Sequence, residues 1–164
     1  MIKRMQSIVN KDIFIEPWEC PLTGKEGLCF VGMTEIYDIR FFIVDNDAVY
    51  VVTIPRRSAF RLVDETYLDE LGRLTGTGVK HPRYKTYKIW GTPFLKELDA
   101  QGLLFLHRPN KEDHFQYIIY TEDESPEFVS PPPEIKVYPG ENCREIMKRL
   151  CDADFKTREE KGFA

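Results

Sequence analysis

The sequence IYDIRFFIVDNDAVYVVTI, residues 36–54, has the clearest secondary-structure pattern in this chain. The first half, Ile36–Val44, has the period of a strand: one face holds Tyr37, Ile39, Phe41 and Ile43, and the other holds Asp38 and Arg40. The second half, Ala48–Ile54, is rich in β-branched and aromatic residues, which favour strands. The intervening DND tolerates the positive φ angles of a tight turn. We therefore predict an antiparallel β-hairpin here.

Shorter apolar runs predict further strands at residues 13–16, 28–31, 103–107, 114–120 and 135–138. We expect the runs at 103–107 and 114–120 to form a second hairpin, joined by RPNKED. The segment TEDESPEFVSPPP, Thr121–Pro133, is polar and ends in three consecutive prolines. We interpret it as a surface connection.

Helical periodicity occurs in three places. Apolar residues within Ser58–Leu74 recur at spacings of three and four, which predicts a helix that begins after Ser58 or after Asp64, since both can cap. Thr92–Gly102 predicts a short helix capped by Thr92. The strongest pattern lies near the C-terminus, where one helical face would bury Cys143, Ile146, Met147, Leu150, Cys151 and Phe155.

Expected strands outnumber expected helices and do not alternate with them regularly. This order predicts an α+β fold, in which a mainly antiparallel sheet packs against two or three helices. The chain has 164 residues, 42% of them hydrophobic, which suits one domain spanning 1–164 with its own core. We expect the polar tail at 156–164 to fray.

Composition also indicates in which cellular compartment we expect the protein. The longest strongly apolar stretch, Ala48–Ile54, is far shorter than the roughly 18 residues that a membrane span needs. The opening residues MIKRMQSIVNKDIF carry charges and lack a long apolar core, so we expect no signal peptide and a cytoplasmic protein. The net charge of −4 gives no global attraction to nucleic acid.

The four cysteines do not have the spacing of a metal site. Structural zinc sites place cysteines two to four residues apart, whereas Cys20 and Cys29 are separated by eight residues and Cys143 and Cys151 by seven. On a helix, the second pair would lie about 12 Å apart, beyond the roughly 7 Å limit for a disulfide. We expect Cys143 and Cys151 to be buried and reduced. Pairing or metal binding by Cys20 and Cys29 stays open.

Other chemical motifs are incomplete. FFIVDND resembles the Asp-x-Asp metal motif of sugar-nucleotide transferases, but a second apolar strand starts directly after it, so a hairpin turn is the preferred interpretation. GRLTGTGVK, residues 72–80, has the glycines of a phosphate loop but no Lys-Ser or Lys-Thr pair. The three histidines occur in no nucleophile signature. We therefore predict no catalytic residue, metal or cofactor.

Charge is segregated along the chain. Residues 71–96 contain six Lys and Arg and no acid, whereas residues 112–135 contain seven Asp and Glu and no base. In the basic stretch, aromatic residues lie among the bases, and its possible phosphate or nucleic-acid contacts are Lys80, Arg83, Tyr84, Lys85, Tyr87, Lys88 and Trp90. In the acidic stretch, a surface for a basic protein would use Glu112, Asp113, Glu122, Asp123, Glu124 and Glu127.

From this pattern we favour a non-enzymatic protein-binding module. Its concrete form is a small acidic inhibitor or immunity-type protein that blocks a basic partner by surface complementarity. One alternative is a nucleic-acid or nucleotide-binding protein that uses residues 80–90. A second alternative is a small hydrolase or transferase whose site has no recognisable motif. A third interpretation also stays open: the two charge blocks have no binding role and either face each other within the fold or lie on solvated surfaces.

Overall fold

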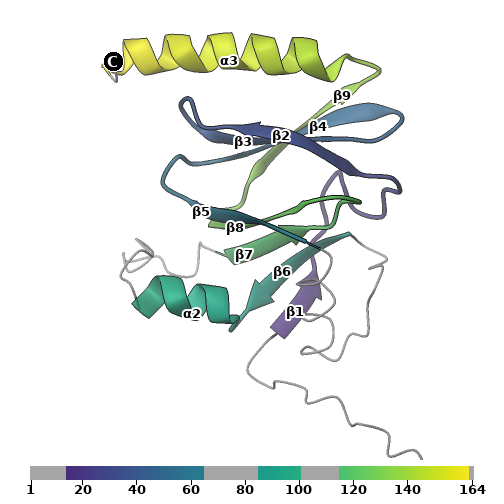
Figure 1. Ribbon diagram of the computed structural model, residues 1–164, viewed down its shortest axis with the longest axis vertical. Helices are drawn as coiled ribbons and strands as arrows, with labels where there is room; N and C mark the ends of the chain where they lie inside the picture. Colours follow the sequence, from purple (N-terminus) through teal and green to yellow (C-terminus); the bar gives the residue numbers. More distant parts are fainter. Residues whose placement is uncertain (1–13, 65–84, 101–114, 163–164) are drawn as a thin grey trace, which may run out of the picture.

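The computed structural model describes residues 14–64, 85–100 and 115–162, which form nine strands and two helices. One sheet has the order β2-β3-β4-β9, with bounds Cys29–Thr34, Ile39–Val44, Ala48–Ile54 and Glu134–Pro139. The other has the order β1-β6-β7-β8-β5, with bounds Phe14–Pro17, Thr86–Trp90, Phe115–Ile119, Ser125–Ser130 and Ala59–Val63. The helices are α2, Pro93–Ala100, and α3, Cys143–Glu160. Figure 1 shows four layers: α3, the β2–β9 sheet, the β1–β5 sheet and α2.

The predicted α+β class is wrong, because the described chain is mostly antiparallel sheet, in two layers that pack face to face. Two segments account for the error. The predicted helix within Ser58–Leu74 contains strand β5 instead, and a start after Asp64 lies outside the described residues. The predicted surface connection contains β8, whose six residues are all buried.

The spacing in β5 imitates a helix for a physical reason. Phe60 and Val63 are three residues apart, so in a strand they lie on opposite faces. Phe60 packs into the core between the sheets, and Val63 belongs to a separate cluster on the other face of its sheet. A strand with apolar residues on both faces loses the alternation of period two, and the pattern then resembles a helix.

The predicted hairpin is confirmed as β3 and β4, with Val44 opposite Val49 and Ile39 opposite Ile54. Its Phe41 is fully buried between the sheets and stacks on Phe128 of β8 at a ring distance of 5.5 Å. Phe128 in turn stacks on Tyr117 of β7. The Tyr117 hydroxyl has no hydrogen-bond partner among the described residues, and burial raises the pKa of Tyr117 to about 12.

Helix α3 covers the outer face of the β2–β9 sheet. The Oδ1 atom of Asn142 accepts a hydrogen bond from Glu145 N–H and caps the helix. On the sheet side, α3 packs against a cluster of Phe42, Val49 and Val51, to which it contributes Ile146 and the partly buried Cys143, Met147 and Leu150. The predicted C-terminal helix is therefore confirmed, and it continues to Glu160, through part of the segment expected to fray.

The prediction that Phe155 of α3 is buried is wrong. Phe155 is 55% exposed, and its neighbour Asp154 is buried instead. Both carboxylate oxygens of Asp154 accept hydrogen bonds from Arg40 of β3, at 2.8 Å each. Arg40 also donates to Thr53 Oγ1 at 3.0 Å. This charged pair and the hydrogen bond from Arg158 Nη1 to the Ile36 carbonyl at 3.1 Å, rather than an aromatic contact, hold the second half of α3 on the sheet.

Helix α2 lies against the outer face of the other sheet and is described from Pro93 to Ala100, and Gly102, which was expected to follow its end, lies outside the described residues. Thr92 caps it as predicted, because its Oγ1 accepts a hydrogen bond from Leu95 N–H. Leu98 packs against Val129 of β8. Of the predicted second hairpin, residues 103–107 lie outside the described residues, and β7 pairs with β6 and β8. Neither α2 nor α3, the helices that the structure describes, is long and apolar enough to cross a membrane.

The Arg40–Asp154 pair yields a stability prediction. Asp154→Ala leaves the half-buried guanidinium of Arg40 without its carboxylate, so we expect a loss of about 3–5 kcal/mol in the free energy of unfolding, measured by urea denaturation. The double variant Arg40→Met with Asp154→Leu removes both charges and should recover most of that loss. A loss below about 1 kcal/mol for Asp154→Ala would mean that the pair behaves like an exposed one.

Candidate acidic binding site

The acidic residues singled out from the sequence divide into three groups. Glu122, Asp123 and Glu124 are exposed in the turn between β7 and β8. Glu127 is fully buried within β8, so it does not belong to an acidic surface. Glu112 and Asp113 lie outside the described residues. Only the turn therefore supplies a described acidic surface from the predicted set.

The β7–β8 turn reaches across to the edge of the facing sheet. Glu122 N–H donates to the Leu28 carbonyl at 2.8 Å, and Phe30 N–H donates to Asp123 Oδ1 at 3.1 Å. Within the turn, Thr121 Oγ1 also donates to the Glu124 carbonyl at 2.6 Å. The turn thus satisfies backbone groups at the edge of β2 and joins the two sheets there. Because Asp123 performs this structural task, it is less available to a partner than its neighbours.

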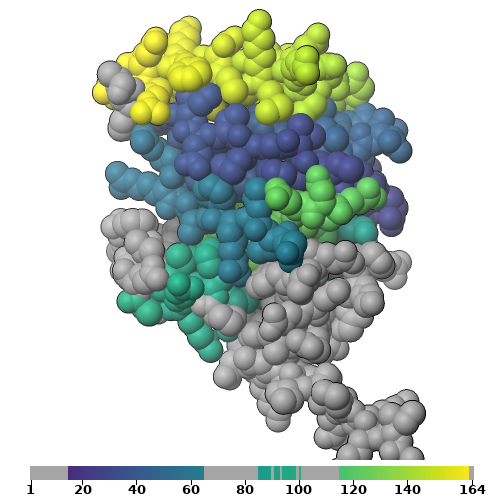
Figure 2. Space-filling view, viewed as in Figure 1, coloured from purple at the N-terminus to yellow at the C-terminus, as the bar shows by residue number. Residues whose placement is uncertain are grey.

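More carboxylates lie at the same end of the sandwich. The pairing of Cys29 with Val44 brings the β3–β4 turn, with Asp45 and Asp47, beside the start of β2. Glu26, in the loop before β2, lies 4.0 Å from Lys85 Nζ. We call this group the acidic end: Glu26, Asp45, Asp47, Glu122, Asp123 and Glu124. In Figure 1 it is the right-hand end of the two sheets, and in Figure 2 green atoms of the β7–β8 region adjoin the dark blue atoms of β2.

Asp45 is a structural member of the acidic end. Its Oδ1 accepts hydrogen bonds from Asp47 N–H at 2.8 Å and Ala48 N–H at 2.9 Å, and its Oδ2 accepts one from the Tyr50 hydroxyl at 2.9 Å. Burial alone would raise the pKa of Asp45, but these bonds outweigh it and lower that pKa. Burial and the bond to Asp45 raise the pKa of Tyr50 to about 12. Among the described residues of the acidic end, the carboxylates that accept no hydrogen bond from a backbone amide are Glu26, Asp47, Glu122 and Glu124.

Cys29 lies at the base of the acidic end. Its Sγ is 3.8 Å from Glu122 Oε2. Burial, together with the negative charges of Glu122 and Asp123, raises the pKa of the Cys29 thiol. All four cysteines are free thiols, and each is partly exposed, so Cys143 and Cys151 are less buried than predicted. Among the described residues, no group of three or more His, Cys, Asp or Glu side chains could hold a metal ion.

The basic–aromatic set does not share one face in the described part of the chain. Tyr87 is buried and packs edge-to-face on Tyr120. Lys88, the next residue in β6, lies on the opposite face, with its Nζ 4.6 Å from the centre of the Phe115 ring. Lys85 forms the contact with Glu26 already described. Lys80, Arg83 and Tyr84 lie outside the described residues, as does the side chain of Trp90.

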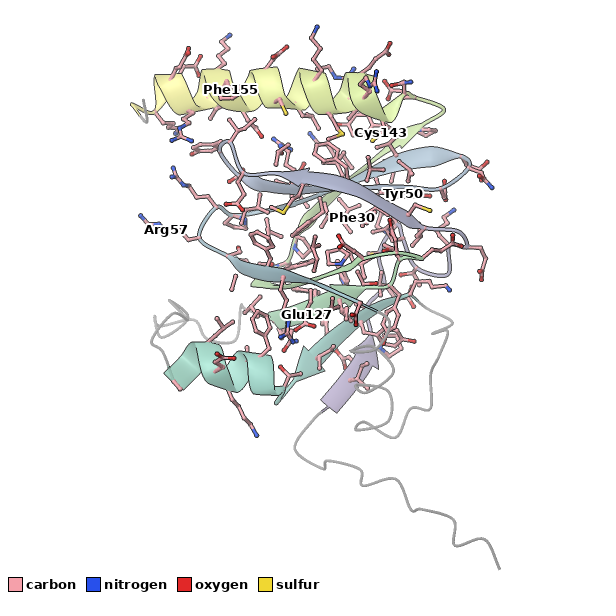
Figure 3. The ribbon with its side chains drawn as sticks, in the orientation of Figure 1. Phe30, Tyr50, Arg57, Glu127, Cys143 and Phe155 are labelled. Atoms are coloured by element: carbon pink, nitrogen blue, oxygen red, sulfur yellow. The ribbon has the colours of Figure 1, made fainter. Side chains whose placement is uncertain are left out.

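A buried polar cluster beneath α2 has no counterpart in the sequence analysis. Glu127 Oε1 accepts hydrogen bonds from Arg61 Nη2 at 2.9 Å and Gln116 Nε2 at 2.7 Å. The Thr92 hydroxyl that caps α2 donates to Gln116 Oε1. The guanidinium of Arg61 lies 4.1 Å above the Phe94 ring of α2. Figure 3 shows Glu127 on the α2 side of its sheet. Since its members come from three strands and one helix start, no spacing could have revealed it.

We predict that Asp123 stabilises the fold and that Glu124 does not. Asp123→Ala removes the side-chain acceptor of Phe30 N–H at an exposed position, which should cost about 0.5–1.5 kcal/mol in urea unfolding. Glu124→Ala is the matched control, because that side chain is exposed, and it should change stability by less than about 0.5 kcal/mol. Equal effects of the two changes would show that the bond between the sheets contributes nothing.

A second prediction concerns the pH dependence contributed by Asp45. Its folded-state pKa lies below the unfolded value of about 3.9, so the wild type has this stabilisation above that pH and loses it as the pH falls through the folded pKa. Asp45→Ala lacks the carboxylate at every pH. It should be less stable than the wild type by about 1–3 kcal/mol at pH 7, and the difference should narrow on acidification. A difference that stays constant down to about pH 2 would contradict this assignment.

Comparisons of this chain with protein-family models, with curated proteins and with solved structures found no match.

Proposed function

We propose that this protein is a small protein-binding module of the inhibitor or immunity type, which uses its acidic end to block a basic partner protein in the cytoplasm. One observation supports this proposal above the others. Three separate chain segments, the loop before β2, the β3–β4 turn and the β7–β8 turn, place six carboxylates at one end of the sandwich. In the described part of the chain, Lys25 near Asp45 and Lys85 near Glu26 are the lysines recorded beside them. A concentration of one sign of charge attracts a partner of the opposite sign.

The acidic end is also rigidly supported, which favours binding. Backbone hydrogen bonds from Glu122 and to Asp123 hold the β7–β8 turn, and Asp45 holds the β3–β4 turn through two backbone amides. A surface that is already ordered loses little conformational entropy when a partner binds. The exposed carboxylates of Asp47, Glu122 and Glu124 are then left to steer the encounter.

The described residues give less support to nucleic-acid binding. Stacking of bases needs an aromatic face that solvent can reach, beside cations that contact phosphate. Tyr87 is only 8% exposed, and Lys88 lies over Phe115 on the opposite face. The net charge of −4 opposes phosphate as well. For a hydrolase or transferase, the buried Glu127 is the notable carboxylate, but it is held by Arg61 and Gln116 beneath α2.

The proposal is tested by differential capture from the host. Three baits are immobilised: the wild type, an acidic-end variant with Asp47→Lys, Glu122→Lys and Glu124→Lys, and a control variant with Asp152→Lys, Glu159→Lys and Glu160→Lys on α3. Both triple variants change the net charge equally, and all six positions are exposed. We expect a basic protein that the wild type and the α3 variant retain and the acidic-end variant loses. With that partner purified, its association rate should fall about tenfold or more in the acidic-end variant at low salt.

Circular dichroism and urea unfolding of both variants show that the fold is kept. Retention that is insensitive to salt, or equal for the two variants, contradicts the proposal. So does a gel shift with mixed single- and double-stranded probes that is lost on Arg83→Ala, Lys85→Ala and Lys88→Ala together, because this result would assign the function to nucleic-acid binding.

A further inference from the structure

In the described part of the chain, strand β9 leaves one side of its backbone unpaired. Gly140 N–H donates to the Asp47 carbonyl, which fixes the phase of hydrogen bonding between β4 and β9. In an antiparallel ladder, bonded residues alternate along the strand, so Glu134, Lys136 and Tyr138 bond to β4. Ile135 and Val137 therefore direct their N–H and C=O groups away from β4. Neither residue's backbone has another partner among the described residues.

The edge strand at the other side of this sheet is protected, whereas no described segment pairs with the free edge of β9. At β2, the β7–β8 turn covers Leu28 and Phe30, and a register shift between Phe30 and Gly32 interrupts the edge. A bulge of this kind hinders pairing with another strand. On β9 the ladder with β4 is regular over its full length, and Val137 is 40% exposed. An exposed regular edge can accept a further strand.

We propose that β9 pairs antiparallel with β9 of a second copy of this chain, about a two-fold axis at Ile135. The charges on β9 favour a second copy of this chain as the pairing partner, and they also favour one register of the two strands. Glu134 and Lys136 lie on the same face, two residues apart, and their side chains are 64% and 63% exposed. With the axis at Ile135, Glu134 of each copy faces Lys136 of the other, which gives two attractive cross-strand pairs.

The alternative two-fold registers are less favourable. An axis at Lys136 places the two lysines opposite each other, and like charges in that position are destabilising. An axis at Val137 places Lys136 opposite Tyr138 and forms no ion pair between the copies. With the axis at Ile135, the two Ile135 residues exchange both backbone bonds, and each Val137 N–H reaches the Pro133 carbonyl of the other copy. Pro133 and Pro139 have no N–H group, so they limit the length of the pairing.

A contact through so few backbone bonds belongs to the small and weak class of interfaces. We therefore expect a reversible dimer, seen by sedimentation velocity at protein concentrations on the order of 0.1 mM. Pairing of this kind is separate from the acidic end, so the variant Glu122→Lys with Glu124→Lys should dimerise like the wild type. That control makes a failure of the dimer distinguishable from a failure of the proposed function.

Charge exchange tests the register directly. Lys136→Glu alone places Glu134 opposite another glutamate, and Glu134→Lys alone places two lysines in opposition, so each single variant should be monomeric at concentrations where the wild type dimerises. An equimolar mixture of the two single variants should associate again, because every pair is then attractive. The double variant Glu134→Lys with Lys136→Glu should also recover the dimer.

Both positions are exposed, so these changes leave the core intact, and circular dichroism checks the fold. A wild type that stays monomeric up to about 1 mM overturns the proposal. A dimer that both single charge variants form as readily as the wild type also overturns it, because another surface would then hold the copies together. Val137→Pro removes an N–H group that points away from β4, and a dimer that survives this change contradicts pairing through the backbone of β9.

Discussion

The architecture depends on one constraint: the β3–β4 hairpin is apolar on both faces. Phe41 and Val52 point into the space between the sheets, whereas Phe42 and Val51 point the other way. A sheet with two apolar faces needs a cover on each. The second sheet covers one face and α3 covers the other, and the order of layers in Figure 1 follows from this requirement. The same reasoning applies to the second sheet, whose outer face receives α2.

Polar groups refine this layered arrangement. The Arg40–Asp154 pair fixes α3 on one outer face, and the cluster around Glu127 lies beneath α2 on the other. Buried charges are costly unless they are paired and hydrogen bonded, so each cluster holds only where strand and helix meet in one arrangement. Both clusters therefore favour one position and orientation of each helix on its sheet. Apolar contacts alone specify that position less well.

The carboxylates show how one residue type takes three roles. Asp154 and Glu127 are buried partners of arginines. Asp123 and Asp45 are hydrogen-bond acceptors that hold turns. The exposed carboxylates that remain, such as Glu124, form the surface that we assign to a partner. A count of charges along the chain treats all of these alike, which is why the predicted acidic surface included Glu127.

Local sequence patterns were enough to predict the β3–β4 hairpin, the strands β1, β2 and β9, the Thr92 cap and the long helix α3, because each of these depends on periodicity or capping within a few neighbouring residues. That Ala59–Val63 and Ser125–Ser130 are strands depends on contacts between segments distant in the chain. In the first, both faces are covered and the alternation is lost. In the second, partners distant in sequence satisfy the polar groups, as Arg61 does for Glu127. The packed structure also places Asp154 rather than Phe155 against the sheet, because Asp154 pairs with Arg40 of β3, which is 114 residues away in the chain. No local pattern records such a partner, since it exists only after the two sheets and the helix have packed together.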